Sequence, residues 1–304
     1  MRGRGVGRDR RPDGVLRSSA AAGAGRTDMT EMDDRPARAA RTIYDDQRAA
    51  RAIYDDQRAK RPIGRLAGGL HPRDLTEAFK VQDGVIARYL AGGFGEISGW
   101  KIALTSKVQQ QRFHVDHPFE GAMFATLMHA SPHTVKASDY LQLGAESEIV
   151  LKLGRDLPAS CAPYTRESVA EAVSACMAGI EIADLRDFAK TAIDATVLVS
   201  DNAMARGCVA GPEVADWRKL DLGAARCRMI VNGESVGEGH GRDALGHPLE
   251  ALAWLANRLV ERGRPLKAGH LVMTGSLVAA RALAPGEELV TAIDGLGEAR
   301  LRVT

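Results

Sequence analysis

The spacing of apolar side chains changes twice along the chain. Residues 1–36 contain mostly Arg, Gly, Ala and Asp with few large apolar side chains, which predicts a disordered N-terminal arm. In residues 37–96, apolar side chains recur at the three- and four-residue intervals of amphipathic helices. From 97 to 304 they form short runs between glycines, which is typical of strands. The pattern predicts an α+β protein with a helical N-terminal region and a mostly β body.

A ten-residue tandem repeat lies within the helical region. ARTIYDDQRA at 40–49 is followed directly by ARAIYDDQRA at 50–59. Ten residues are about 2.8 helical turns, so the two Ile-Tyr pairs are expected on different faces of one helix. Pro62 is expected to end this helix. Two short copies do not make a solenoid, and we interpret the repeat as a local duplication that lengthened a surface helix.

Local signals place helices and strands in the rest of the chain. Asp74 begins a capping-box-like segment for a helix through residue 90, and Thr165 is expected to cap a helix over 166–177. Pro248 suits the first position of an amphipathic helix. Strands are expected at 99–104, 144–153, 179–183, 270–275, 289–293 and 299–303, and a hairpin with a type I′ Asn-Gly turn at 228–237.

Two glutamates interrupt the apolar strand GAESEIVLKL at 144–153. Side chains alternate between the faces of a strand, so Glu146 and Glu148 point the same way, roughly 6–7 Å apart along the backbone. Two ionised carboxylates side by side repel each other and are costly to bury. A hard cation such as Mg²⁺ would turn this repulsion into attraction. The alternative is an edge strand whose polar face is solvated.

A third glutamate, Glu181, lies between isoleucines in a strand of sequence GIEIA. Taken alone, it is compatible with an outward-facing side chain on a half-exposed strand. Together with Glu146 and Glu148, it can supply one face of an octahedral Mg²⁺ site and leave positions for water and substrate. Lys101, on another strand, is either a cation for substrate binding and proton transfer or a solvated side chain.

Charge is distributed unevenly. Residues 1–65 hold 16 Lys and Arg against 10 Asp and Glu, and the remaining residues hold 25 against 29. The net charge of +2 therefore comes from the N-terminal segment, and the body is not expected to bind nucleic acid. Four scattered cysteines suit a reducing compartment, and no apolar run approaches the ~20 residues of a membrane span. A cytoplasmic protein without membrane partners is expected.

Six longer segments also stand out: GWKIALTSK (99–107), GAESEIVLKLGRDLP (144–158), GIEIADLRDF (179–188), VSDNAMARGCVAG (199–211), LGHPLEALAWLANRL (245–259) and AGHLVMTGS (268–276). In this order, over about residues 40–304, they make the chain resemble the family of 2-keto-4-pentenoate hydratase and 4-oxalocrotonate decarboxylase. This family lies within the fumarylacetoacetase superfamily.

The resemblance implies a fold and a cofactor. The body, residues 97–304, is expected to be a mixed β-roll or barrel of the fumarylacetoacetase type with flanking helices. A divalent cation, Mg²⁺ or Mn²⁺, is expected, and the ligands implied are Glu146, Glu148 and Glu181. The resemblance also implies a homo-oligomer that acts on a small 2-oxo or 2-hydroxy-dienoic acid, either alone or with a pathway partner enzyme.

Further site residues follow from the resemblance. Lys101 corresponds to the family lysine and is a candidate for both catalysis and substrate binding. In place of the family's Pro-Asp-Phe-Gly-like motif, Phe119 occupies the aspartate slot, so Glu120 and Asp116 are the candidate acid or base. Met204 replaces a small hydroxyl residue. The candidate substrate-binding residues are Lys101, Asn202, Thr274, Gly275 and Ser276, the last three of which could instead form only a tight turn.

The reaction expected is hydration of a 2-hydroxy-2,4-dienoate, either 2-oxopent-4-enoate-like or 2-oxohept-ene-dioate-like, in the catabolism of aromatic compounds. One alternative is 2-oxo-3-hexenedioate (4-oxalocrotonate) decarboxylation. The metal-stabilised 2-oxo group that accepts electrons in the first reaction can also accept the electrons left behind when CO₂ departs. The other is a non-catalytic homologue that retains the metal site, which only the altered segment 115–121 favours.

Overall fold

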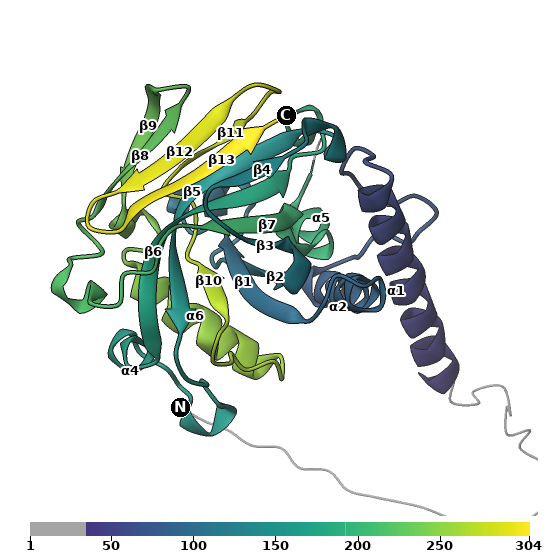
Figure 1. Ribbon diagram of the computed structural model, residues 1–304. Coiled ribbons are helices and arrows are strands. Elements are labelled where there is room, and N and C mark those ends of the chain that lie inside the picture. Colours follow the sequence, from purple (N-terminus) through teal and green to yellow (C-terminus); the bar gives the residue numbers. More distant parts are fainter. Residues whose placement is uncertain (1–34, 192) are drawn as a thin grey trace, which may run out of the picture. The chain divides into compact units, whose positions relative to one another are not determined.

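The computed structural model describes residues 35–191 and 193–304 (Figure 1). The chain divides into two units, residues 1–40 and residues 41–304. Residues 1–34, which make up most of the predicted disordered arm, lie outside the described residues. Helix α1 (Arg35–Arg58) begins in the first unit and continues into the second. Both sheets belong to the second unit.

Two sheets form the body of the second unit. The first has the strand order β2 (Phe119–Phe124), β1 (Ile97–Ala103), β10 (Leu271–Met273), β5 (Leu143–Leu153), β6 (Val173–Asp184), β7 (Ala205–Ala210) and β3 (Met128–Ala130), and β11 (Val278–Ala282) also pairs with β5. The second has the order β4 (His133–Val135), β13 (Gly297–Val303), β12 (Glu288–Ile293), β8 (Arg226–Val231) and β9 (Glu234–His240).

Strands β5 and β6 form the long centre of the first sheet, and one of their faces packs on the second sheet. Ala145 and Ile182 on that face share a buried cluster with Leu301 of β13. The hydroxyl oxygens of Ser147 and Thr291 lie 2.6 Å apart between the sheets. Because side chains alternate along a strand, the residues between these positions face the opposite side, where the predicted metal ligands lie.

Helices pack around the first sheet. Helix α6 (Pro248–Glu261) begins with Pro248 in its first turn, as predicted, and shares a buried cluster with Ile149 and Leu151 of β5. These two residues lie on the same face of β5 as Ser147. The remaining helices are α2 (Leu75–Ala91), α3 (Lys107–Arg112), α4 (Arg166–Ala170) and α5 (Ala195–Ser200).

Helices α1 and α2 approach each other closely. A Cβ atom on Gly84 of α2 would lie 2.6 Å from the Cβ of Ala50, so only glycine permits this packing. The capping role predicted for Asp74 is confirmed, because its side chain accepts a hydrogen bond from a backbone N–H of the first turn of α2. The repeat also behaves as predicted. Ile53 of the second copy is buried, whereas Ile43 of the first copy is 64% exposed.

The prediction of a helix over 166–177 is wrong. Helix α4 ends at Ala170, and strand β6 begins at Val173. Thr165 caps α4 as expected. Alanine and glutamate favour a helix in this segment, but residues from Val173 onward pair with β5 and, further along, with β7. These ladders outweigh local helix propensity, as sheet context commonly does.

The predicted hairpin at 228–237 is confirmed. Strands β8 and β9 are joined by Asn232 and Gly233, whose φ angles of +50° and +85° are those of a type I′ turn. In the described part of the chain, no helix combines the length and apolar content needed to cross a membrane. The α+β fold class with N-terminal helices and a two-sheet body is confirmed.

Candidate metal centre

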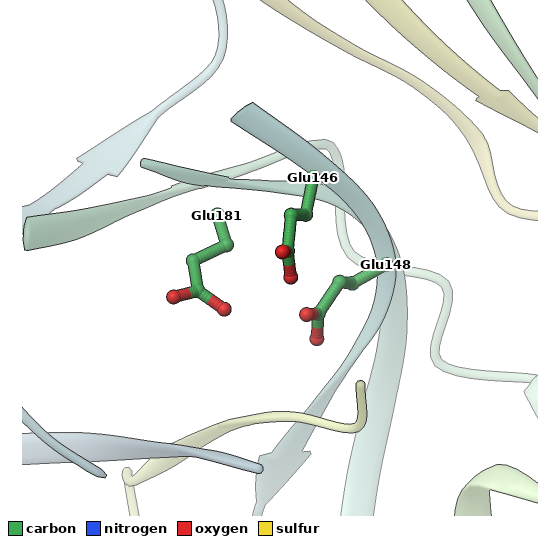
Figure 2. A group of neighbouring side chains, drawn as sticks. All are labelled: Glu146, Glu148 and Glu181. Carbon is green, nitrogen blue, oxygen red and sulfur yellow. The ribbon is translucent and has the colours of Figure 1, made fainter. Parts of the chain in front are cut away.

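Glu146, Glu148 and Glu181 direct their carboxylates into one space (Figure 2). Glu146 and Glu148 lie two residues apart on β5, and Glu181 is directly opposite Glu146 on β6. The ligand atoms of the three side chains all lie within 4.8 Å of one another. Glu148 and Glu181 are fully buried, and Glu146 is partly exposed. Pairing of two adjacent strands thus brings together the three residues that the sequence singles out.

Strand β5 is not an edge strand. It pairs with β6 on one side and with β10 and β11 on the other. The alternative of a solvated polar face on an edge strand is therefore wrong, and two of the three carboxylates are removed from water.

Few hydrogen-bond donors reach the carboxylates of the cluster. Oε2 of Glu148 accepts a hydrogen bond from the Gly275 N–H at 2.8 Å, but Oε1 of Glu148 and Oε2 of Glu181 have no hydrogen-bond partner among the described residues. Burial, with repulsion from the neighbouring carboxylates, raises the pKa of Glu181 to about 7 and that of Glu148 well above its usual value. Buried oxygen ligands with unmet negative charge fit a hard divalent cation.

Lys101 extends from β1 toward this cluster. Its Nζ lies 3.0 Å from Oε1 of Glu181 and donates a hydrogen bond to the carbonyl oxygen of Ala203 at 3.1 Å. The lysine is 5% exposed. Burial by itself lowers the pKa of a lysine, but the charges of the three glutamates outweigh burial and raise the pKa of Lys101. The amine therefore stays protonated at neutral pH and offsets one negative charge.

The carbonyl that accepts from Lys101 belongs to a left-handed turn. Asn202, Ala203 and Met204 have φ angles of +60°, +53° and +59°, and each such residue costs about 1–3 kcal/mol. The Asn202 side chain holds the turn against β2. It accepts from the Ala122 N–H at 2.8 Å and donates to the Ala122 carbonyl at 2.9 Å. The Asn202 amide, predicted to bind substrate, is therefore occupied by backbone hydrogen bonds. By holding the turn, it positions the Ala203 carbonyl that accepts from Lys101.

Behind this turn lies a buried polar network centred on Asp201. Its carboxylate pairs with the guanidinium of Arg186. Gln57 donates to the Asp201 carbonyl at 2.9 Å and to its carboxylate at 3.0 Å, and the Tyr89 hydroxyl donates to Gln57 at 2.8 Å. The sequence alone does not indicate this network, because Gln57 belongs to the duplicated helix and lies 144 residues from Asp201.

Gly121 on β2 makes room for Lys101. The two residues are direct partners in the β1–β2 ladder. A Cβ atom on Gly121 would lie 2.8 Å from the Asn202 carbonyl oxygen and 3.2 Å from side-chain carbons of Lys101. Glycine inside a strand is a signal for close backbone approach, so the sequence contains a sign of this contact that the prediction missed.

The structure does not bring Glu120 and Asp116 to the cluster. Glu120 is next to Gly121, the strand partner of Lys101, in the chain. Because side chains alternate along a strand, Glu120 faces the other side of the sheet from Lys101. It is fully buried, 2.5 Å from a guanidinium nitrogen of Arg262 and 3.5 Å from one of Arg258. The Asp116 side chain is 97% exposed. A catalytic role for either residue is not supported, and the contacts of Glu120 are those of a structural ion pair between β2 and the C-terminal end of α6.

Thr274, Gly275 and Ser276 connect β10 to β11 alongside β5, and the segment passes beside Glu148. Gly275 has φ +113°, and a Cβ atom on it would lie 2.4 Å from the side chain of Thr105. The hydroxyls of Thr274 and Ser276 both donate to backbone carbonyls. In this segment, the N–H of Gly275 makes the contact with the glutamate cluster.

Phe119 and Met204 place apolar side chains around Ala203, whose carbonyl holds Lys101. Phe119 is fully buried and lies on the same face of β2 as the lysine's partner Gly121. It shares an apolar cluster with Ala203, and Met204 packs against this cluster. The slot in which the resemblance implies an aspartate therefore holds a phenyl ring.

Comparison with known proteins agrees with this fold. The family model for the fumarylacetoacetate (FAA) hydrolase C-terminal domain matches residues 105–304. The chain belongs to this family. Within the FAA hydrolase family, a 2-keto-4-pentenoate hydratase from Burkholderia vietnamiensis is 35% identical over 234 residues, which are 76% of this chain and 87% of the relative. A 2-hydroxyhexa-2,4-dienoate hydratase from Comamonas testosteroni is 35% identical over 212 residues, 68% of this chain and 78% of the relative.

A solved structure is also similar to this FAA hydrolase family chain. It is a 4-oxalocrotonate decarboxylase from Pseudomonas putida G7 in complex with magnesium and adipate. The TM-score is 0.78 at 28% sequence identity, and the match covers 85% of this chain and 97% of the decarboxylase. The same decarboxylase has been solved with calcium and acetate.

Proposed function

We propose that the chain is a metal-dependent hydratase that adds water to a 2-hydroxy-2,4-dienoate in the catabolism of aromatic compounds. The observation that carries the proposal is the buried cluster of Glu146, Glu148 and Glu181 with Lys101 in contact. The hydratases among the relatives support the reaction class. Substrates of the 2-oxopent-4-enoate-like and 2-oxohept-ene-dioate-like types are both candidates.

The proposed cation is Mg²⁺ or Mn²⁺, with Glu146, Glu148 and Glu181 as its ligands. Three carboxylate ligands would leave coordination positions of the cation for the carboxylate and 2-oxo oxygens of a substrate. When bound, such a cation acts as a Lewis acid that stabilises negative charge on the 2-oxo oxygen. Magnesium in the similar decarboxylase structure supports this choice of cation.

Lys101 is proposed to transfer a proton to the substrate during the reaction. Its Nζ is protonated, lies beside Glu181 and is held in place by the Ala203 carbonyl. From there, it can donate a proton to substrate carbon or hydrogen-bond a substrate carboxylate. The net reaction adds the hydrogen and hydroxyl of one water across a carbon–carbon double bond. Phe119 and Met204 pack around Ala203, whose carbonyl holds the lysine.

Decarboxylation of 2-oxo-3-hexenedioate is the second candidate. Two observations favour it: the similarity to the decarboxylase structure and the phenyl ring of Phe119 in the aspartate slot. An apolar surrounding disfavours a charged carboxylate relative to neutral CO₂, and the reaction needs no positioned water. Cytoplasmic location, homo-oligomerisation and association with a partner enzyme stay predictions from the sequence and its family resemblance.

The test follows the ultraviolet absorbance of freshly generated 2-hydroxydienoates of five and six carbons and of 2-oxo-3-hexenedioate, with and without Mg²⁺, and measures released CO₂ in parallel. We expect metal-dependent loss of dienol absorbance without CO₂ and a product heavier than its substrate by one water. Stoichiometric CO₂ release would replace hydration by decarboxylation. No turnover of any of these three substrates with Mg²⁺ or Mn²⁺ would contradict both reactions and leave the non-catalytic homologue.

A further inference from the structure

Arg206 lies on β7 at a β-bulge. In the β6–β7 ladder, Gly207 pairs with Ile182 and Ala205 pairs with Ala183, so Arg206 is the extra residue on the bulged strand. A bulge re-aims the side chain it carries. The bulge therefore frees Arg206 from the strict alternation that places Glu181 on the metal-site face.

The guanidinium of Arg206 has unmet hydrogen-bonding capacity. Its Nη1 donates to the carbonyl of Ala205 at 2.8 Å, but Nη2 is buried and has no hydrogen-bond partner among the described residues. Within the same part of the chain, no carboxylate lies within ion-pair distance of it, whereas Arg186 pairs with Asp201 and Arg262 pairs with Glu120. A buried cationic nitrogen without a partner is costly, and an anion from solution would remove that cost.

Arg206 lines a cavity of about 370 Å³, to which Arg58 and Lys60 also contribute. Two acidic residues, Asp184 and Asp139, lie in the same wall. Both oxygens of Asp184 accept backbone N–H bonds, which orients its carboxylate, but its negative charge and that of the exposed Asp139 still count against the three cations. Three cations against two carboxylates leave the wall a net charge of +1, and one of the cations, Arg206, has a guanidinium nitrogen without a hydrogen-bond partner among the described residues.

Two aromatic residues, Tyr140 and Phe94, also line the cavity, and Tyr140 adds a hydrogen-bond donor. Burial, with the nearby charge of Asp139, raises the pKa of Tyr140 to about 12, so its hydroxyl stays protonated and can donate. The guanidinium of Arg58 lies 5.2 Å from the ring centroid of Phe94, which holds it against the wall. Lys60 uses one ammonium proton on the Ser138 carbonyl at 2.7 Å and has two others.

We propose that this cavity binds a small oxyanion, a carboxylate or a phosphate, with Arg206 as the principal ligand and Lys60, Arg58 and Tyr140 as further donors. Guanidinium groups match the paired oxygens of both anions, and the volume is at the lower end of that of small-molecule sites. Neither Lys101 nor any of the three clustered glutamates lines the cavity. The site is therefore separate from the candidate metal centre, and the inference does not rest on the proposed reaction.

The test measures binding of inorganic phosphate and of succinate to the full-length, EDTA-treated protein by isothermal titration calorimetry. Without metal, the glutamate cluster repels both anions, so binding reports on the second site. We expect saturable binding of at least one anion. Arg206→Met should weaken it about tenfold or more, the effect of a lost charge-assisted hydrogen bond. Lys60→Met, at an exposed residue whose loss does not threaten folding, should weaken it about threefold.

Arg155→Met is the matched control, because Arg155 is an exposed arginine whose ion pair with Glu171 lies at the surface. It should bind as the wild type does. Selective binding of phosphate or of succinate identifies the anion class. Wild-type protein that binds neither anion at tens of millimolar, or Lys60→Met and folded Arg206→Met proteins that both bind like wild type, would overturn the proposal.

Discussion

Replacing Glu148 with glutamine should abolish the response of the protein to Mg²⁺ while leaving it folded. Glutamine has the same shape and can still accept the Gly275 N–H bond, so the change removes a charge from the centre and little else. We expect at least a ~100-fold fall in metal-dependent turnover, the scale of a lost electrostatic group at a reaction centre. Thermal unfolding measured with and without Mg²⁺ reports metal binding independently of turnover.

The free energy of unfolding should change in a defined direction for wild type and for Glu148→Gln, with Mg²⁺ and in EDTA. Wild type in Mg²⁺ at 100 times its dissociation constant should gain about 2.7 kcal/mol, and Glu148→Gln should gain far less at the same concentration. In EDTA, the variant should be at least as stable as wild type, because one of three mutually repelling carboxylates, itself fully buried, is gone.

Glu120→Gln is the matched control for this substitution, since it makes the same change at another fully buried glutamate. Its partners are Arg262 and Arg258 rather than the cluster, so it should lose stability and keep its Mg²⁺ response. A Glu148→Gln protein with wild-type stabilisation by Mg²⁺ would remove this residue from the proposed ligand set. A Glu120→Gln protein that is stable and inactive would restore the catalytic role predicted for Glu120.

Replacing Lys101 with methionine should separate catalysis from metal binding. The variant loses the amine that contacts Glu181 and the Ala203 carbonyl but keeps all three carboxylates. We expect kcat to fall by about 10²–10⁴-fold, the range for a proton-transfer group. Stabilisation by Mg²⁺ should be retained or increased, because a neighbouring positive charge has been removed. Steady-state kinetics and Mg²⁺-dependent unfolding measure the two effects separately.

Lys152→Met is the control for this experiment. Lys152 lies on β5 but pairs with the surface residue Glu213 at 2.6 Å, and exposed pairs of this kind contribute about 0–1 kcal/mol. This control should keep wild-type kinetics. If Lys101→Met retained more than about a third of the wild-type kcat, proton transfer by Lys101 would be refuted.

The parts of the fold that the sequence predicts well are those with a local cause. Asp74 caps α2 because its carboxylate reaches a backbone N–H within the first turn. Asn232 and Gly233 form the hairpin turn because few other dipeptides adopt two positive φ angles. The alternation of Glu146 and Glu148 with apolar neighbours likewise follows from strand geometry alone.

What the sequence does not predict depends on partners far along the chain. Val173 begins a strand because β5 and β7 are available to β6, which local propensity does not reveal. The left-handed turn at Asn202 is stabilised by Ala122, and the Gln57 bond to Asp201 spans 144 residues. Such contacts depend on strand register and helix packing, and no pattern within a short window contains that information.

The most direct measurement of the central claim is anomalous scattering from Mn²⁺ in crystals of the wild-type protein. We expect a peak between β5 and β6 with an oxygen of Glu146, Glu148 and Glu181 each in its coordination shell, and no such peak in Glu148→Gln crystals treated identically. Wild-type crystals saturated with Mn²⁺ that show the ion elsewhere, or show these three carboxylates without an ion between them, would contradict the assignment of the metal centre.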